Sequence, residues 1–140
     1  MSGGSALPLS PGDLVAGRFE VDHVLGRGGM GVVFSAVDAE RGALVAIKCL
    51  LPELCENADL VTRFVREGQA TTRLHSEHVA RVFEIGTLAS GIPFLVMEQL
   101  EGADLRSYVR AYGPLSPRDA AIYVAQACEA LAEAHALGII

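Results

Sequence analysis

Four glycines and a lysine farther along the chain are the residues whose types and spacing point most directly to chemistry. The run Gly26-Arg27-Gly28-Gly29-Met30-Gly31 has G-x-G-x-x-G spacing, and Lys48 ends a Val-Ala-Ile-Lys segment. Because glycine has no Cβ, a backbone rich in it can turn tightly and approach a ligand closely. The pattern is typical of a loop that holds phosphate groups, with Lys48 as the cation beside them.

The residues after the glycines distinguish two kinds of phosphate-binding loop. In a dinucleotide-binding fold the loop opens a helix whose N-terminus faces the pyrophosphate. Here the segment 32–37 follows, and its β-branched and aromatic residues favour a strand. A nucleotide-dependent oxidoreductase is therefore a minor alternative, which bound NAD would support.

Composition and charge bound the possible functions. The chain has 140 residues, with 11 Lys and Arg against 17 Asp and Glu, and a formal net charge of −6. This balance argues against a nucleic-acid partner or an anionic lipid partner. Cys49, Cys55 and Cys128 form no C-x-x-C pair, so neither a zinc site nor a disulfide framework is indicated, and a cytoplasmic location is favoured. No charge-free apolar stretch is long enough to predict a membrane segment in this chain.

Hydrophobic patterning predicts the elements that must position the glycines and the lysine. Five strands are expected, at 19–25, 30–39, 43–51, 79–88 and 92–99. A helix is expected from Leu60, and two more at 104–112 and 117–137. The strands are expected to form an antiparallel meander in an α+β layer. The last helix is apolar nearly all round, which is typical of a buried helix.

Glu67 occupies an unusual position on the first predicted helix. It falls on the apolar stripe that Phe64, Thr71 and Leu74 form. A carboxylate on a core-facing stripe needs a partner, and Lys48 on the preceding strand is the obvious candidate. The sequence therefore predicts a Lys48–Glu67 ion pair. The alternative is that Glu67 tilts to the helix edge and is solvated, as most isolated helical glutamates are.

Taken in order, these motifs resemble those of a bacterial serine/threonine protein kinase of the eukaryotic-like type. The resemblance covers Phe19 to Ile140 and rests on the glycine-rich loop, the Val-Ala-Ile-Lys strand, the Arg66-Glu67 pair, the segment 94–98 and the segment 134–140. It implies an α+β fold: a kinase N-lobe with a five-stranded antiparallel sheet and an αC helix, followed by two helices of an incomplete C-lobe. The expected organisation is a disordered leader at 1–16, an ATP-binding N-lobe at 17–100, and the hinge exit and first helices of a truncated C-lobe at 101–140.

The resemblance also implies which residues bind ATP. Those that cover the phosphates are Gly26, Gly28, Gly29 and Gly31. Those that pack on the adenine are Leu25, Val33 and Ala46.

The remaining site residues are also carried over from the resemblance. Lys48 would contact the α and β phosphates and pair with Glu67. Met97 looks like the gatekeeper, and the backbone of Glu98 and Leu100 looks like the hinge that bonds the adenine. Asp104 matches a position often near the ribose, although it could equally be the N-cap of its helix.

The activity that the resemblance implies is transfer of the ATP γ-phosphate to Ser or Thr of a protein substrate. In this family the His-Arg-Asp loop and the Mg²⁺ ligands follow the segment at which the chain stops, so no metal site is expected here. Mg²⁺ is expected for the complete kinase, and the fragment alone is expected to be inactive. The alternative is a non-catalytic kinase-like module that binds a nucleotide or a protein. His75 and His78 are expected to be polar loop residues rather than metal ligands.

Overall fold

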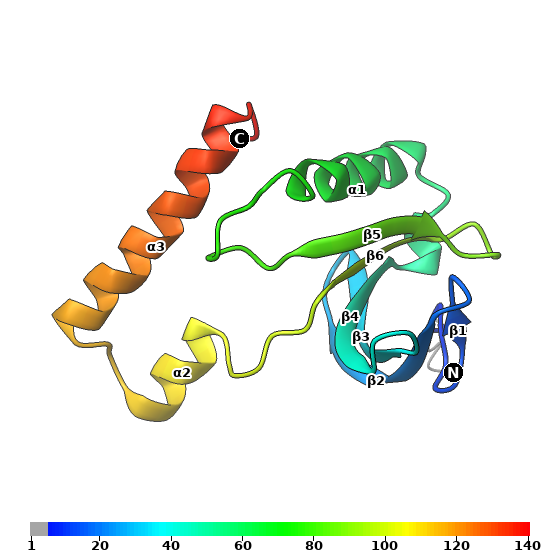
Figure 1. Ribbon diagram of the computed structural model, residues 1–140, viewed down its shortest axis with the longest axis horizontal. Coiled ribbons are helices and arrows are strands. Elements are labelled where there is room, and N and C mark those ends of the chain that lie inside the picture. The colour runs from blue at the N-terminus through cyan, green and yellow to red at the C-terminus, as the bar shows by residue number, and fades with distance from the viewer. Residues whose placement is uncertain (1–5) are drawn as a thin grey trace. The chain divides into compact units, whose positions relative to one another are not determined.

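The computed structural model describes residues 6–140, which form two compact units (Figure 1). The first unit comprises Arg81–Gln99 and the described part of Met1–Arg73. The second comprises Leu74–Ala80 and Leu100–Ile140. Each unit has its own set of internal contacts.

The first unit is built on a six-stranded antiparallel sheet. Its strands are β1 (Leu14–Val15), β2 (Phe19–Arg27), β3 (Gly31–Asp38), β4 (Ala43–Leu50), β5 (Val82–Thr87) and β6 (Pro93–Glu98). Their order across the sheet is β1-β2-β3-β4-β6-β5. The α+β class and the antiparallel pairing expected from the sequence are confirmed.

The predicted meander is wrong, because β6 lies between β4 and β5. The connection from β4 to β5 runs through a short 3-10 helix at Pro52–Leu54 and the helix α1 (Ala58–Thr71). So long a connection lets β5 pair on the far side of β6. Local patterning finds the strands, but long-range pairing sets their order.

The sixth strand, β1, lies in the segment that the sequence predicted to be a disordered leader. Residues 1–5 of that leader lie outside the described residues. In the remainder, Val15 pairs with Phe19, and both Val15 and Leu9 are buried in the main core. The reason is a tight turn at Ala16 and Gly17, both with positive φ, which returns the chain onto β2.

Alternation along β3, β4 and β6 divides the sheet into two faces of different character. We call one the inner face; its residues are Val32, Phe34, Ala36, Val45, Ile47, Cys49, Phe94 and Val96, all buried in one apolar cluster. We call the other the outer face; its residues are Val33, Ser35, Ala46, Lys48, Leu95 and Met97.

The helix α1 covers part of the outer face, where it packs against β5 and β6 (Figure 1). Asn57 begins the helix by accepting hydrogen bonds from the N–H groups of Asp59 and Leu60. Phe64 and Gly68 are the buried residues of α1. A Cβ on Gly68 would lie 2.5 Å from a Leu95 methyl carbon, so glycine is what allows the helix to approach the sheet this closely.

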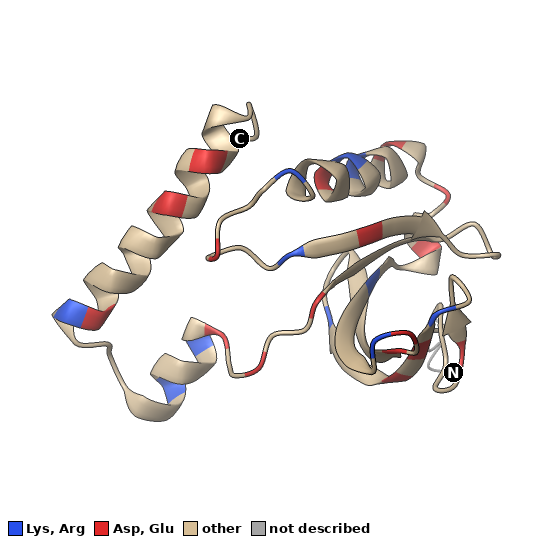
Figure 2. Ribbon diagram, in the orientation of Figure 1, with Lys and Arg blue, Asp and Glu red and all other residues tan. Residues whose placement is uncertain are grey.

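The second unit contains α2 (Leu105–Tyr112) and α3 (Pro117–Ala136). The Ser116 hydroxyl caps α3 by accepting from the Asp119 N–H at 3.1 Å. Figure 2 shows acidic residues in the C-terminal half of α3. One of these, Glu133, accepts hydrogen bonds from the N–H groups of His75 and Ser76 and so fixes the loop 74–80. Among the described residues, Ala134 is the one buried side chain of α3.

Candidate nucleotide-binding site

The glycine-rich loop is the tip of the hairpin formed by β2 and β3. Gly26 pairs with Val33, and the Gly28 N–H donates to the Gly31 carbonyl at 2.9 Å. The hairpin continues into β4 through the pairing of Gly31 with Leu50. The loop is therefore held at its base by the sheet, and its tip is exposed.

The protein's own packing explains one of these glycines and leaves three unexplained. A Cβ on Gly31 would lie 2.8 Å from the Cys49 carbonyl oxygen, so β4 requires glycine there. Gly26, Gly28 and Gly29 have no positive φ, and a Cβ added to any of them would meet no described atom within 4 Å. A ligand that needs close access to the backbone is a physical reason for glycine at these three positions.

Lys48 lies on the outer face, beside Val33 on one neighbouring strand and Leu95 on the other. It is half-buried, and its ammonium lies 6.0 Å from the centre of the Phe64 ring. In the part of the chain that the structure describes, Lys48 forms no ion pair. A half-buried cation without an acidic partner fits an anionic ligand such as a phosphate group.

The predicted Lys48–Glu67 ion pair is wrong for this structure. Glu67 instead accepts a hydrogen bond from Arg63 Nε at 2.8 Å, with more than 60% of both side chains exposed. The two residues are one helical turn apart, so their side chains meet on the surface of α1. The buried stripe passes through Phe64 and Gly68, and Glu67 lies beside it. An arginine four residues before the glutamate was the sequence signal for this outcome.

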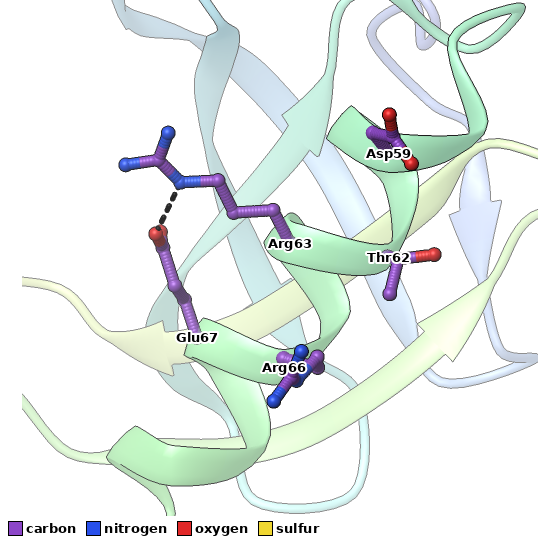
Figure 3. A pocket seen from close by; sticks show the side chains of 5 residues that line it. All are labelled: Asp59, Thr62, Arg63, Arg66 and Glu67. Carbon is purple, nitrogen blue, oxygen red and sulfur yellow. Dashed lines mark hydrogen bonds and ion pairs between the residues drawn. The ribbon is translucent and has the colours of Figure 1, made fainter.

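Figure 3 shows these two side chains pointing toward one another along α1. They line an open pocket of about 340 Å³ together with Asp59, Thr62 and Arg66. All five lining residues come from α1, and the glycine-rich loop does not contribute to the pocket. The pocket is therefore distinct from the candidate nucleotide site.

The residues expected to surround the adenine come together on the outer face, except for one. Ala46 pairs with Met97, and Val33 pairs with Lys48, which follows Ala46 by two residues on the same face of β4. Ala46 is buried, whereas Val33 and Met97 are half-buried. Leu25 precedes the loop on β2 and is exposed. The arrangement gives an apolar floor next to Lys48.

The polypeptide after Met97 carries the expected hinge. The Glu98 N–H donates to the carbonyl of Arg81, the residue before β5, at 2.8 Å, so this N–H already has a partner. Gln99 accepts a hydrogen bond from the Ser35 hydroxyl at 2.8 Å. Ser35 and Gln99 could not be predicted from the sequence, because a single serine in a strand gives no signal of a partner 64 residues away.

Leu100 and Asp104 belong to the second unit. Leu100 is exposed. Asp104 is the N-cap of α2, where its carboxylate accepts from the Ser107 N–H at 2.7 Å. This hydrogen bond, with a further one from the Ser107 side chain, holds the pKa of Asp104 below its ordinary value. Of the two roles expected for Asp104, the structure shows the helix cap.

Among residues 6–140, no group of three or more His, Cys, Asp or Glu side chains could hold a metal ion. His75 and His78 lie in the loop 74–80, where Glu129 bonds the His78 ring at 3.0 Å. None of the helices within the described residues has the length and apolarity needed to span a bilayer.

Comparison with known proteins gives consistent matches. The family described as "Protein kinase domain" matches residues 19–140. A relative named "Probable serine/threonine-protein kinase PknB", from Corynebacterium glutamicum, is 38% identical over 130 residues, which are 91% of this chain and 20% of the relative. Serine/threonine-protein kinase PkaA from Streptomyces coelicolor is 36% identical over 137 residues, with 90% of this chain and 25% of the relative covered.

The fold also matches a solved structure. The crystal structure of the Mycobacterium tuberculosis PknI kinase domain superimposes with a TM-score of 0.80 at 26% identity. The match covers 93% of this chain and 52% of that one. The chain thus spans between a fifth and a quarter of the two curated relatives, and about half of the solved kinase domain.

Proposed function

The chain belongs to the protein kinase family, and on this premise we propose that residues 19–140 are the ATP-binding part of a serine/threonine protein kinase. The complete protein would transfer the γ-phosphate of ATP to Ser or Thr of a protein substrate. The names of the relatives support serine and threonine as acceptors. Because the chain spans only part of those relatives, the activity is assigned to the complete protein and nucleotide binding to this part.

The observation that carries the proposal is the absence of any packing reason for Gly26, Gly28 and Gly29 within the described residues. Backbone N–H groups in such a loop can donate to phosphate oxygens, provided that no side chain stands between. Lys48 on the adjoining strand would supply the positive charge for the same oxygens. ATP, when bound, supplies the transferable phosphoryl group.

The roles proposed for the other sheet residues come from the resemblance to protein kinases and are compatible with their places on the sheet. Val33, Ala46 and Leu25 would pack against the adenine, with Met97 at the back of the same floor. At the hinge, the Glu98 carbonyl is the candidate acceptor for the base, because its N–H is bonded to Arg81.

The remaining proposed roles concern the hinge, the ribose and the metal ion. Leu100 would supply a backbone hinge contact, and Asp104 would lie near the ribose. We assign no ion pair between Lys48 and Glu67, since Glu67 is bonded to Arg63. Mg²⁺ is proposed as the cofactor of the complete kinase, with no ligand assigned among residues 6–140.

We further propose a cytoplasmic location, where nucleotide and reducing conditions occur together. The three cysteines are all free. Burial, with a smaller contribution from Cys55, raises the pKa of the Cys49 thiol to about 12. Such a thiol remains protonated at neutral pH and resists oxidation, so Cys49 behaves as a small apolar side chain.

Thermal unfolding of the chain with increasing ATP tests the proposed function. At a nucleotide concentration about one hundred times Kd, binding to the folded state adds about 2.7 kcal/mol to its stability. We expect a concentration-dependent rise of the unfolding temperature with ATP and ADP. No rise at millimolar nucleotide would contradict nucleotide binding by this part of the protein.

The variant Gly28→Ala makes the test specific to the loop. A Cβ at this position meets nothing among the described residues, so the nucleotide-free chain should lose no stability and should gain slightly, because alanine restricts the unfolded chain. The added methyl group would lie where the phosphates approach, so the rise with ATP should be reduced. An unchanged response to ATP would show that the loop does not contact the phosphates.

A further inference from the structure

A partly buried hydrogen bond ties β3 to the polypeptide that leaves β6. The Ser35 hydroxyl donates to Gln99 Oε1 at 2.8 Å, although the two residues are 64 positions apart. Ser35 is only 1% exposed and is one of two buried polar or charged residues among residues 6–140, the other being Asp38. A buried hydroxyl is unfavourable unless it is hydrogen-bonded, so this contact satisfies a group that would otherwise destabilise the fold.

The position of this bond relates it to the candidate site. Ser35 pairs with Ala46, and Ala46 pairs with Met97, so the three form one row across the outer face. Val33, two residues before Ser35, points to the same side of the sheet. Ser35 therefore lies in the row that forms the apolar floor of the site.

The other partner lies within the expected hinge. Gln99 stands between Glu98 and Leu100, the two residues whose backbone groups the proposed function assigns to the base. It follows the last residue of β6, so the ladder hydrogen bonds of the strand no longer hold it. The side-chain hydrogen bond to Ser35 holds Gln99 in place where the backbone has left the strand.

Sheet stability does not account for a serine here. Serine is not among the β-branched and aromatic residues that strands favour, and its neighbours in the outer-face row, Ala46 and Met97, carry apolar side chains. An alanine would fill nearly the same volume without a hydroxyl to satisfy. The hydrogen bond to Gln99 is therefore the reason for a serine at position 35.

We propose that Ser35 and Gln99 are positioning residues that fix the peptide Glu98–Leu100 for recognition of the nucleobase. This inference rests on the proposed function, because it concerns how tightly the same site binds the nucleobase. Neither side chain needs to touch the nucleotide. They act through the orientation of the hinge backbone.

The test compares two probes that use different parts of the site. ADP contacts both the hinge and the loop, whereas inorganic triphosphate contacts the loop and Lys48 alone. For Ser35→Ala we expect Kd for ADP to rise about tenfold, as for the loss of one intramolecular hydrogen bond, and Kd for triphosphate to stay unchanged. Gln99→Ala should have the same effect, and the double variant should lose no more than either single one, because both changes remove one contact.

Ser90→Ala is the matched control. Ser90 lies in the exposed turn between β5 and β6 and forms no hydrogen bond within the part of the chain that the structure describes. It should change neither Kd. An equal rise of both constants in Ser35→Ala would indicate general loosening of the fold and overturn the positioning role. Unchanged constants would overturn it as well.

Hydrogen–deuterium exchange on the nucleotide-free chain separates this inference from the proposed function. If the unaltered chain binds no nucleotide, the proposed function fails, but the hinge can still be examined. Ser35→Ala should accelerate exchange in the segment 98–101 while leaving β3 and β4 protected. Unchanged exchange in that segment would overturn the inference, whatever the nucleotide result.

Discussion

The two faces of the same three strands have opposite characters. On the inner face of β3, β4 and β6, alternate residues are apolar and fully buried in one cluster. On the outer face, the same strands carry a serine hydroxyl tied to Gln99, a lysine without an acidic partner among the described residues, and half-buried Val33 and Met97. Packing accounts for every residue of the first set and for only some of the second.

This difference indicates that the inner face of the sheet serves mainly stability, whereas the outer face serves mainly ligand binding. A residue whose identity follows from its neighbours in the fold gives information about stability. A residue whose identity the fold does not require points to something the fold binds. Substitutions on the two faces should therefore have separable effects on stability and on binding.

The largest expected effect is on the inner face. Phe34 is 1% exposed and has the largest side chain of the fully buried residues. Phe34→Ala should lower the free energy of unfolding by about 3–5 kcal/mol, because it removes apolar contacts and leaves a cavity. Urea denaturation followed by circular dichroism measures the loss. A loss below about 1 kcal/mol would contradict the assignment of the core to this face.

The next effect concerns the polar end of the inner face. Arg18 donates to both carboxylate oxygens of the buried Asp38, at 2.8 and 2.6 Å, and its Nε also lies 3.2 Å from Glu40. The Arg18 guanidinium holds the pKa of Asp38 at about 2, below its ordinary 3.8. A carboxylate whose pKa is lower in the folded state adds stability above about pH 4, and this contribution is lost as the pH falls toward about 2.

The variant Arg18→Met should reveal that contribution. It keeps most of the side-chain stem but leaves Asp38 without its cation, so stability at neutral pH should fall, by less than in Phe34→Ala. The pKa of Asp38 should rise, and the loss of stability between about pH 4 and pH 2 should become smaller. Acid titrations of the unfolding temperature for both proteins make the comparison. If the unfolding temperatures of the two proteins fall in parallel as the pH is lowered, the Arg18–Asp38 ion pair does not cause the loss of stability in acid.

On the outer face, Lys48→Met should separate binding from stability. The substitution keeps an unbranched side chain beside Phe64 but removes the charge, so the free energy of unfolding should change little. Kd for ATP should rise roughly 10- to 100-fold, as for the loss of a charge-assisted hydrogen bond. Calorimetric titration and thermal unfolding test the two parts. In the complete kinase, we expect this variant to lose phosphotransfer.

Comparison of the sequence predictions with the structure shows where local patterns suffice. The longer strands and the helices follow from alternation and from β-branched residues, whereas the grouping of Val33, Ala46 and Lys48 was expected only from the resemblance to protein kinases. The strand order does not, because pairing β6 with β4 depends on contacts far apart in sequence. The short β1 was missed since a two-residue strand among Gly and Pro has no periodicity.

The predicted Lys48–Glu67 ion pair is absent from the structure for an instructive reason. The expectation of a Lys48–Glu67 pair relied on a helical stripe in which Glu67 seemed central. The structure shows that the stripe is narrower and passes through Gly68, a residue without a side chain that hydrophobic patterning cannot register. Once Gly68 is recognised as the contact point, Glu67 falls to the side and bonds the nearby Arg63.

Within the loop itself, Gly31 and Gly28 provide a direct comparison. Gly31→Ala should lower the free energy of unfolding by about 1–3 kcal/mol, because its Cβ would press against the Cys49 carbonyl oxygen. Gly28→Ala should cost no stability, with a slight gain from the restricted unfolded chain, and should weaken nucleotide binding. Chemical denaturation of the two nucleotide-free variants decides the matter. Equal stabilities would show that β4 does not require Gly31.

The smallest expected effect is in the turn that brings β1 onto the inner face. Ala16 has a φ of 52°, a left-handed conformation that is unfavourable for residues with a Cβ. Ala16→Gly removes that strain but increases the freedom of the unfolded chain, so the net gain should be only about 0.5 kcal/mol. Because the turn positions Val15 in the core and contributes nothing to the outer face, Kd for ATP should not change. A change in nucleotide affinity without a change in stability would contradict the independence of the two faces.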